Sequence, residues 1–183
     1  PYVPGTPEAA VLDVMGELMG GETAPLFKKL RYDDQVASDM FVDANSAQGF
    51  DSRPLGTYVT VAKEKYDAQG RPLLDRIESD IATAFEGLAN FSSQPEAAKR
   101  LESIKSQIPY DVVASLNSPQ NIAQSFALNY RFTRDPQVYE KVGAAHAPVR
   151  PADIEAFARK YFKPENRVTV TLSGGPGARG GVQ

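Results

Sequence analysis

Two strand-like stretches that lie close together in the sequence constrain the fold most. Residues 36–45 read VASDMFVDAN and residues 55–64 read LGTYVTVAKE, in which the valines alternate with Tyr58 and Thr60. Such alternation is typical of half-buried strands. Only the turn-rich SAQGFDSRP separates the two stretches. The spacing therefore predicts two neighbouring antiparallel strands, because parallel strands need a longer crossover.

Helical periodicity dominates the remainder of the chain. Its clearest case is RPLLDRIESDIATAFEGL, in which one apolar stripe runs from Leu73 to Leu88. We expect helices at 7–18, after Thr23, at 71–88, 94–108 with a break or kink at Pro109, 110–116, 118–132 and 150–162, and a closing strand at 166–172. Strands and helices do not strictly alternate. The pattern predicts an α+β fold, with helices packed on one face of an antiparallel sheet. Because the chain opens on a helix, we expect one or more first strands to be missing.

The segment LMGGETAPLFKKLR, residues 18–31, joins two of these helices. We expect Gly20 and Gly21 to end the first helix in a left-handed conformation, and Thr23 to cap the second, with Pro25 in its first turn. The alternative is a phosphate-binding loop. That loop would follow a strand and carry a lysine at a fixed spacing, and this segment meets neither condition. The glycines therefore favour a turn between helices.

Length and charge limit the classes of protein that fit the chain. Its 183 residues suit one domain, which we place at 1–173, followed by a flexible glycine-rich tail at 174–183. The net charge of −3 argues against a nucleic-acid partner. No apolar run is long enough for a membrane span. The chain starts at Pro1 without a methionine, so we expect it to be processed or cut from something longer.

The residues that carry catalytic chemistry are few. Cysteine is absent, which excludes thiolate nucleophiles and cysteine-ligated zinc, and the single histidine is His146. His146 lies in GAAHAPVRP, which we expect to form a loop, and a surface or structural role fits it best. Asp33, Asp34 and Asp39 could bind a cation, but they lack the spacing of a calcium loop. Composition and motifs alone do not indicate an enzyme.

The order of several motifs resembles the non-catalytic, C-terminal-type domain of the pitrilysin/insulinase family of zinc metallopeptidases, the inverzincins. In that family a helix ends in Leu-Gly-Gly-Gly, and the helix after it ends in Leu-Arg. Residues that agree with this pattern are Leu18, Gly20, Gly21, Leu26, Leu30 and Arg31, whereas Met19, Ala24 and Pro25 depart from it. The segments QVASDMFV and GTYVTVAKE are similar to the next strands of the family. RPADIEAFARKYFKPENRVTVTL resembles its closing segment and is the most specific match.

This resemblance implies two halves, one that carries the catalytic zinc site and one that does not. The zinc site of the family needs H-x-x-E-H and a further glutamate, which one histidine cannot supply. We therefore expect no cofactor in this chain, and zinc in a partner catalytic half, either in the same polypeptide or in a separate subunit. The expected substrate is a peptide. This chain alone is predicted to be inactive. Exported bacterial relatives favour the periplasm.

The resemblance also points to two substrate-binding residues. In many family members the non-catalytic half contributes an arginine, and a tyrosine seven residues later, which help to hold the substrate carbonyl near zinc. Arg31 matches the arginine, and the tyrosine position falls on Ser38. Alternatively, Arg31 is a cation favoured by the helix end. The domain would wall the cavity and help to bind peptide, with QVASDMFV or its neighbour as an edge for peptide addition. The alternative function is a degenerate structural or interaction domain with no part in hydrolysis.

Overall fold

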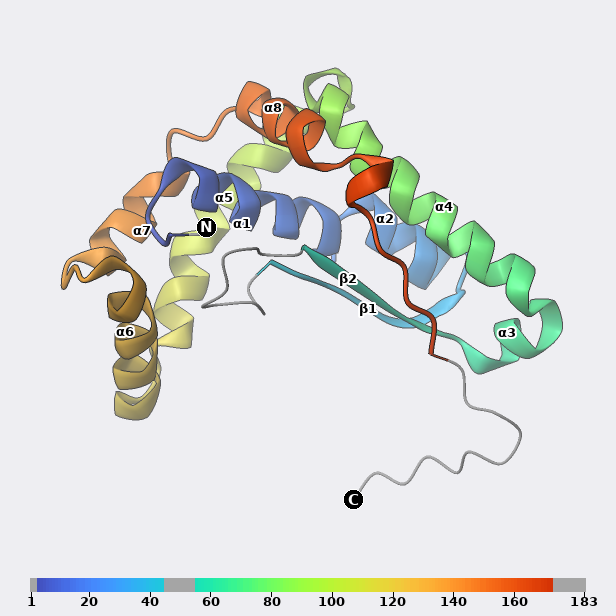
Figure 1. Ribbon diagram of the computed structural model, residues 1–183, viewed down its shortest axis with the longest axis horizontal. Coiled ribbons are helices and arrows are strands. Elements are labelled where there is room, and N and C mark those ends of the chain that lie inside the picture. The colour runs from blue at the N-terminus through green and yellow to red at the C-terminus, as the bar shows by residue number, and fades with distance from the viewer. Residues whose placement is uncertain (1–2, 45–54, 173–183) are drawn as a thin grey trace.

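The computed structural model describes residues 3–44 and 55–172, in which helices form an arch around a two-stranded sheet (Figure 1). The arch runs from α6 and α7 through α8 to α4 and α3, and the sheet lies inside its curve. The elements are α1 Pro7–Gly20, α2 Pro25–Lys28, a π-helical turn Lys29–Asp33, β1 Ala37–Asp43, β2 Gly56–Val61, α3 Lys63–Gln69, α4 Arg71–Gly87, a 3-10 segment Leu88–Ser93, α5 Ala97–Ser115, α6 Pro119–Thr133, α7 Val138–His146, α8 Pro151–Tyr161 and a 3-10 turn Pro164–Asn166.

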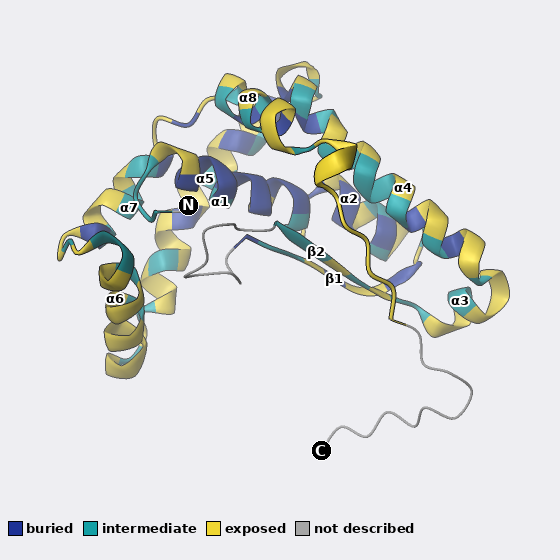
Figure 2. Cartoon of the chain, in the orientation of Figure 1, coloured by how far each residue is buried: buried dark blue, intermediate teal, exposed yellow. Residues whose placement is uncertain are grey.

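The predicted α+β class is confirmed. β1 and β2 pair antiparallel, with Phe41 opposite Tyr58 and Met40 opposite Val59. Helix α1 lies against β1 and also contacts α2, α5, α7 and α8. Val14, Met15 and Leu18 of α1 are almost fully buried, and Figure 2 shows this helix dark blue at the centre of the molecule. A helix that is apolar on most sides belongs in a core, so α1 organises the fold.

The turn between α1 and α2 lies where the glycine pair predicts it, but the expected conformations are wrong. Gly21 is extended, with φ −61° and ψ 149°, and Ala24 rather than Thr23 precedes the first turn of α2. Gly20 is needed for a different reason. A Cβ atom there would lie 2.7 Å from the Cβ of Val42 and 2.9 Å from its nitrogen. The missing side chain thus lets α1 approach β1 closely.

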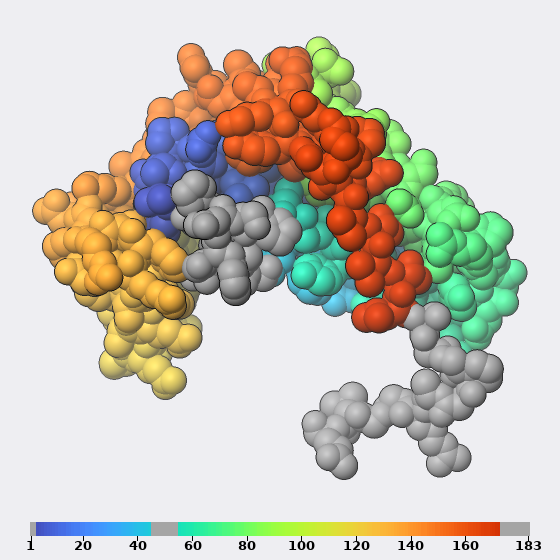
Figure 3. Space-filling view, in the orientation of Figure 1, coloured from blue at the N-terminus to red at the C-terminus, as the bar shows by residue number. Residues whose placement is uncertain are grey.

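The predicted closing strand is wrong. Residues 167–172 are extended but pair with no strand among the described residues, so the sheet there has two strands rather than three. Val168, Val170 and Leu172 are exposed by 87%, 77% and 95%. In Figure 3 this segment, in red, runs over the surface beside α4. Alternating valines favour an extended backbone, but only a neighbouring edge makes that backbone a strand.

The structure has two helices that the sequence did not predict, α3 and α7, and it differs from expectation at Pro109 and in the packing of α4. α3 has no buried residue, and α7 ends at His146, which therefore lies in a helix and not in a loop. α5 runs through Pro109 without a break. Helix α4 contacts α3, the 3-10 segment that follows it, α2 and α8, and neither strand is among its main neighbours.

Some expectations stay untested. SAQGFDSRP and the tail 174–183 lie outside the described residues, and the domain boundary at residue 173 stays a prediction. Within the described ranges, no helix has both the length and the apolar character that a membrane crossing requires.

Candidate functional site

Arg31 lies in the π-helical turn Lys29–Asp33, which carries the chain from α2 towards β1. The nitrogen of Val36 donates to the oxygen of Leu30 at 3.0 Å, and this bond closes the turn. Nη1 of Arg31 donates to the main-chain oxygens of Ala37, at 3.4 Å, and of Ser38. The side chain is half-buried. Arg31 therefore ties the turn to the first residues of β1.

Ser38 lies at an irregularity in the sheet. Ala37 pairs with Val61 and Asp39 with Thr60, so Ser38 is the extra residue of a β-bulge. Its hydroxyl donates to the main-chain oxygen of Thr60 at 3.1 Å. The structure thus brings Arg31 and Ser38 together, through the main-chain oxygen of Ser38 and not through its hydroxyl. Their role in substrate binding stays a prediction.

Ion pairs fix the same turn to α4. Lys29 contacts Asp80 of α4 and Asp34, the latter at 3.3 Å, and Arg76 contacts Asp34 at 3.1 Å. Burial would lower the pKa of Lys29, but hydrogen bonds to Asp80 and Asp34 raise it above its usual value. Asp34 is thus engaged by two cations, which opposes the cation site considered from the sequence. Within residues 3–44 and 55–172, no three His, Asp or Glu side chains form a group that could hold a metal ion.

His146 is buried between α7 and α1. It is 3% exposed, with Nδ1 2.8 Å from the oxygen of Val142 and Nε2 3.2 Å from Asp13 Oδ2 on α1. Both ring nitrogens therefore have a partner, and the contact joins α7 to α1. This agrees with the structural interpretation of the single histidine.

Sequence reasoning missed an aromatic pair on the outer face of the sheet. The rings of Phe41 and Tyr58 are stacked, with centroids 4.7 Å apart, and the residues are 51% and 49% exposed. The usable signal was the alternation along β1, since residues 39, 41 and 43 share one face.

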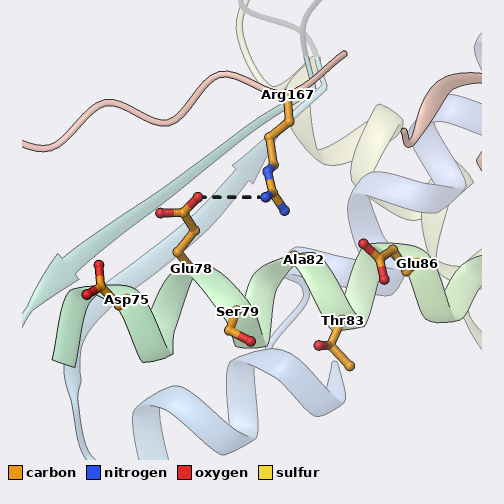
Figure 4. Close-up of a pocket in the computed structure, with 7 residues that line it drawn as sticks. All are labelled: Asp75, Glu78, Ser79, Ala82, Thr83, Glu86 and Arg167. Carbon is orange, nitrogen blue, oxygen red and sulfur yellow. Dashed lines mark ion pairs between the residues drawn. The ribbon is translucent and has the colours of Figure 1, made fainter. Parts of the chain in front are cut away.

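A groove of about 350 Å³ runs along α4 (Figure 4). It is lined by Asp75, Glu78, Ser79, Ala82, Thr83, Glu86 and Arg167. Arg167 reaches across it to Glu78 at 3.8 Å, and Thr169 donates to Glu78 at 3.0 Å. The groove is open and polar, and none of the predicted site residues lies in it. Its contacts hold the extended C-terminal segment against α4.

A family model described as the peptidase M16 inactive domain matches residues 1–108. The chain belongs to this family. The resemblance to the non-catalytic domain of the metallopeptidases is thereby confirmed, on a match that includes the glycine turn, Arg31, Ser38 and both strands.

Two solved structures share the fold of this M16 inactive domain. One is a protease from Helicobacter pylori, with 20% sequence identity and a TM-score of 0.64, covering 84% of this chain and 34% of that one. The other is a candidate zinc protease from Bordetella pertussis Tohama I, with 18% identity and a TM-score of 0.68, covering 91% of this chain and 87% of that one. This chain thus spans about a third of the Helicobacter protein's length. A search of curated proteins found no match.

Proposed function

We propose that this M16 inactive domain is the non-catalytic half of a zinc metallopeptidase. It covers the catalytic half, walls the cavity between them, and helps to bind an extended peptide that a separate H-x-x-E-H half cleaves. The observation that carries the proposal is the match to the inactive-domain model over residues 1–108. The single histidine agrees with it, because zinc peptidase chemistry needs three protein ligands. Zinc therefore belongs to the partner half.

The contribution of this domain to the reaction is positioning and water exclusion rather than metal binding. We propose Arg31 and Ser38 as its substrate contacts. Arg31 lies beside the start of β1, and Nη1 is bound to main-chain oxygens there. A guanidinium has five N–H donors in a fixed fork, so a peptide carbonyl can be held by donors other than those that support β1.

One observation favours the alternative, a structural or interaction domain without a part in hydrolysis. The described contacts of Arg31 Nη1 and of the Ser38 hydroxyl are with main-chain oxygens of this chain, and serine has a shorter reach than the tyrosine of the family. In that case both residues would only stabilise the entry into β1.

The experiment is to purify the chain and an M16 catalytic half separately and to measure zinc content, complex formation and peptide hydrolysis. We expect no stoichiometric zinc and no hydrolysis for this chain, a complex on mixing, and faster chelator-sensitive hydrolysis by the complex than by the catalytic half alone. A complex with unchanged hydrolysis would favour the structural alternative. Tight zinc in the isolated chain, with activity that a chelator abolishes, would overturn both.

A further inference from the structure

The outer face of the sheet carries one row of side chains with a distinct chemistry. The pairs in this row are Asp39 with Thr60, Phe41 with Tyr58, and Asp43 with Gly56. Alternate strand residues share a face, so the two aspartates lie on either side of the aromatic stack. The opposite face is turned to the helices, since Met40 is 3% exposed there.

The aromatic stack on the outer face of the sheet is exposed to solvent. Phe41 and Tyr58 are inclined to each other by only 12° and are about half-exposed. The ring of Tyr58 lies over Gly56. A Cβ atom at Gly56 would lie only 2.7 Å from the Cε2 atom of Tyr58. Glycine thus makes room for the ring. Two large aromatic side chains exposed together form a surface on which a ligand can stack.

The charged neighbour of the stack along β1 is Asp39. Asp39 is exposed and accepts a hydrogen bond from the nitrogen of Met40 at 2.9 Å. No lysine or arginine in the described part of the chain lies within ion-pair distance of Asp39. Arg31 is the cation that contacts this end of β1, and its Nη1 is bound to the oxygens of Ala37 and Ser38. The ligand that complements this surface is therefore a cation.

We propose that this row, which we call the aromatic–acidic row, is a subsite for an arginine or lysine side chain of the bound peptide. The proposal rests on the function above, in which the domain binds an extended peptide. A cation over an aromatic ring is attracted by the ring electrons, and the carboxylate of the exposed Asp39 adds charge attraction. Arginine fits better than lysine, because its planar guanidinium can stack on a ring while it donates to a carboxylate.

The test compares three fluorescent peptides that differ at one central residue, which is arginine, glutamine or glutamate. Their affinities are measured by fluorescence anisotropy, for the full chain and for its complex with a catalytic half made inactive. We expect arginine to bind roughly two- to fivefold more tightly than glutamine, the range for an exposed cation–aromatic contact, and glutamate to bind most weakly. The preference should weaken as salt is added.

Variants test whether the preference for the arginine peptide arises at the aromatic–acidic row. Asp39→Asn and Phe41→Leu should each lower the arginine-to-glutamine ratio, and the double variant should bring it close to one, with folding checked by circular dichroism. Asp67→Asn is the matched control, because it removes the same charge from an exposed position on α3 and should leave the ratio unchanged.

Two other results are distinguishable. If the peptides bind equally well, or if Asp67→Asn lowers the ratio as much as Asp39→Asn, the subsite is wrong and the proposed function stands. If no peptide binds to the chain or to the complex, the proposed function itself fails.

Discussion

At the scale of single residues, Arg31 links stability to the proposed catalysis. Arg31→Ala removes the donors to the oxygens of Ala37 and Ser38. We expect the free energy of unfolding to fall by about 1–2 kcal/mol, towards the lower end of the range for charged hydrogen bonds, because the side chain is half-exposed. If Arg31 also holds the substrate carbonyl, the turnover number of the complete enzyme should fall by about 100-fold, and lysine should restore part of it.

Thermal unfolding and steady-state hydrolysis of the same Arg31 variants separate these two effects. Unchanged turnover, with reduced stability, would end the catalytic role of Arg31 and leave it as a support for β1.

Glu17 predicts a dependence of stability on pH. Partial burial of its carboxyl group raises the pKa of Glu17 above its ordinary value of 4.5, although the residue as a whole is exposed, and the carboxylates of Asp111 and Asp13 raise it further. The folded state then holds this proton more tightly than the unfolded state, so the free energy of unfolding falls as pH rises from about 4.5 through the raised pKa. Glu17→Gln removes a negative charge from the last turn of α1 and from a like-charge pair with Asp13 four residues earlier. It should add about 0.5 kcal/mol at pH 7, since the residue is exposed and screened by solvent, and progressively less as the pH is lowered.

Denaturant unfolding at several pH values measures this effect, with the exposed Glu22→Gln as the control. An equal gain from both variants, or a gain from Glu17→Gln that does not change with pH, would contradict the explanation.

Gly20 and Gly143 are both helical glycines, but their surroundings differ. Gly20→Ala would bring a methyl group against the side chain and backbone of Val42, whereas nothing lies within 4 Å of a Cβ atom at Gly143. We expect Gly20→Ala to lower the free energy of unfolding by about 1–3 kcal/mol through overpacking. Gly143→Ala should raise it by about 0.5–1 kcal/mol through helix propensity. Equal and small effects in thermal unfolding would mean that α1 and β1 are not held in close contact.

At the scale of elements, periodicity predicted those helices that bury a stripe. α4 and α8 have buried apolar residues at helical spacing, and Ser118 caps α6 as expected, since its hydroxyl accepts from the nitrogen of Asn121 at 3.1 Å. α3 buries nothing and gave no signal. The segment 167–172 has the pattern of a strand, but pairing depends on residues far away in the sequence. The aromatic–acidic row depended on the register between β1 and β2, which the sequence does not state.

The packing of α4 on other helices is tested at Phe85. This residue is half-buried and meets Phe162 edge to face, with centroids 4.9 Å apart. Phe85→Ala should cost about 2–3 kcal/mol, less than the 3–5 kcal/mol for a fully buried ring. Phe91, which is 0% exposed, is the control and should give the larger loss. A loss below about 1 kcal/mol for Phe85→Ala would place its ring at the surface.

At the scale of the whole molecule, the chain combines a helical core with a two-stranded sheet whose outer face is open among the described residues. The match over residues 1–108 places it in the M16 inactive-domain family. The fold class and the family could be predicted from the order of the motifs. The geometry around Arg31 could not, because it depends on a π-helical turn and on a bulge at Ser38.

The most direct test of this account is a titration of the chain into a fixed concentration of an M16 catalytic half, with the initial rate of hydrolysis of one extended peptide as the signal. The account predicts that the chain alone is inactive, and that the rate rises with added chain and saturates at one chain per catalytic half. A rate that does not change at any ratio, although the two proteins associate, would contradict the role proposed for this domain in peptide hydrolysis.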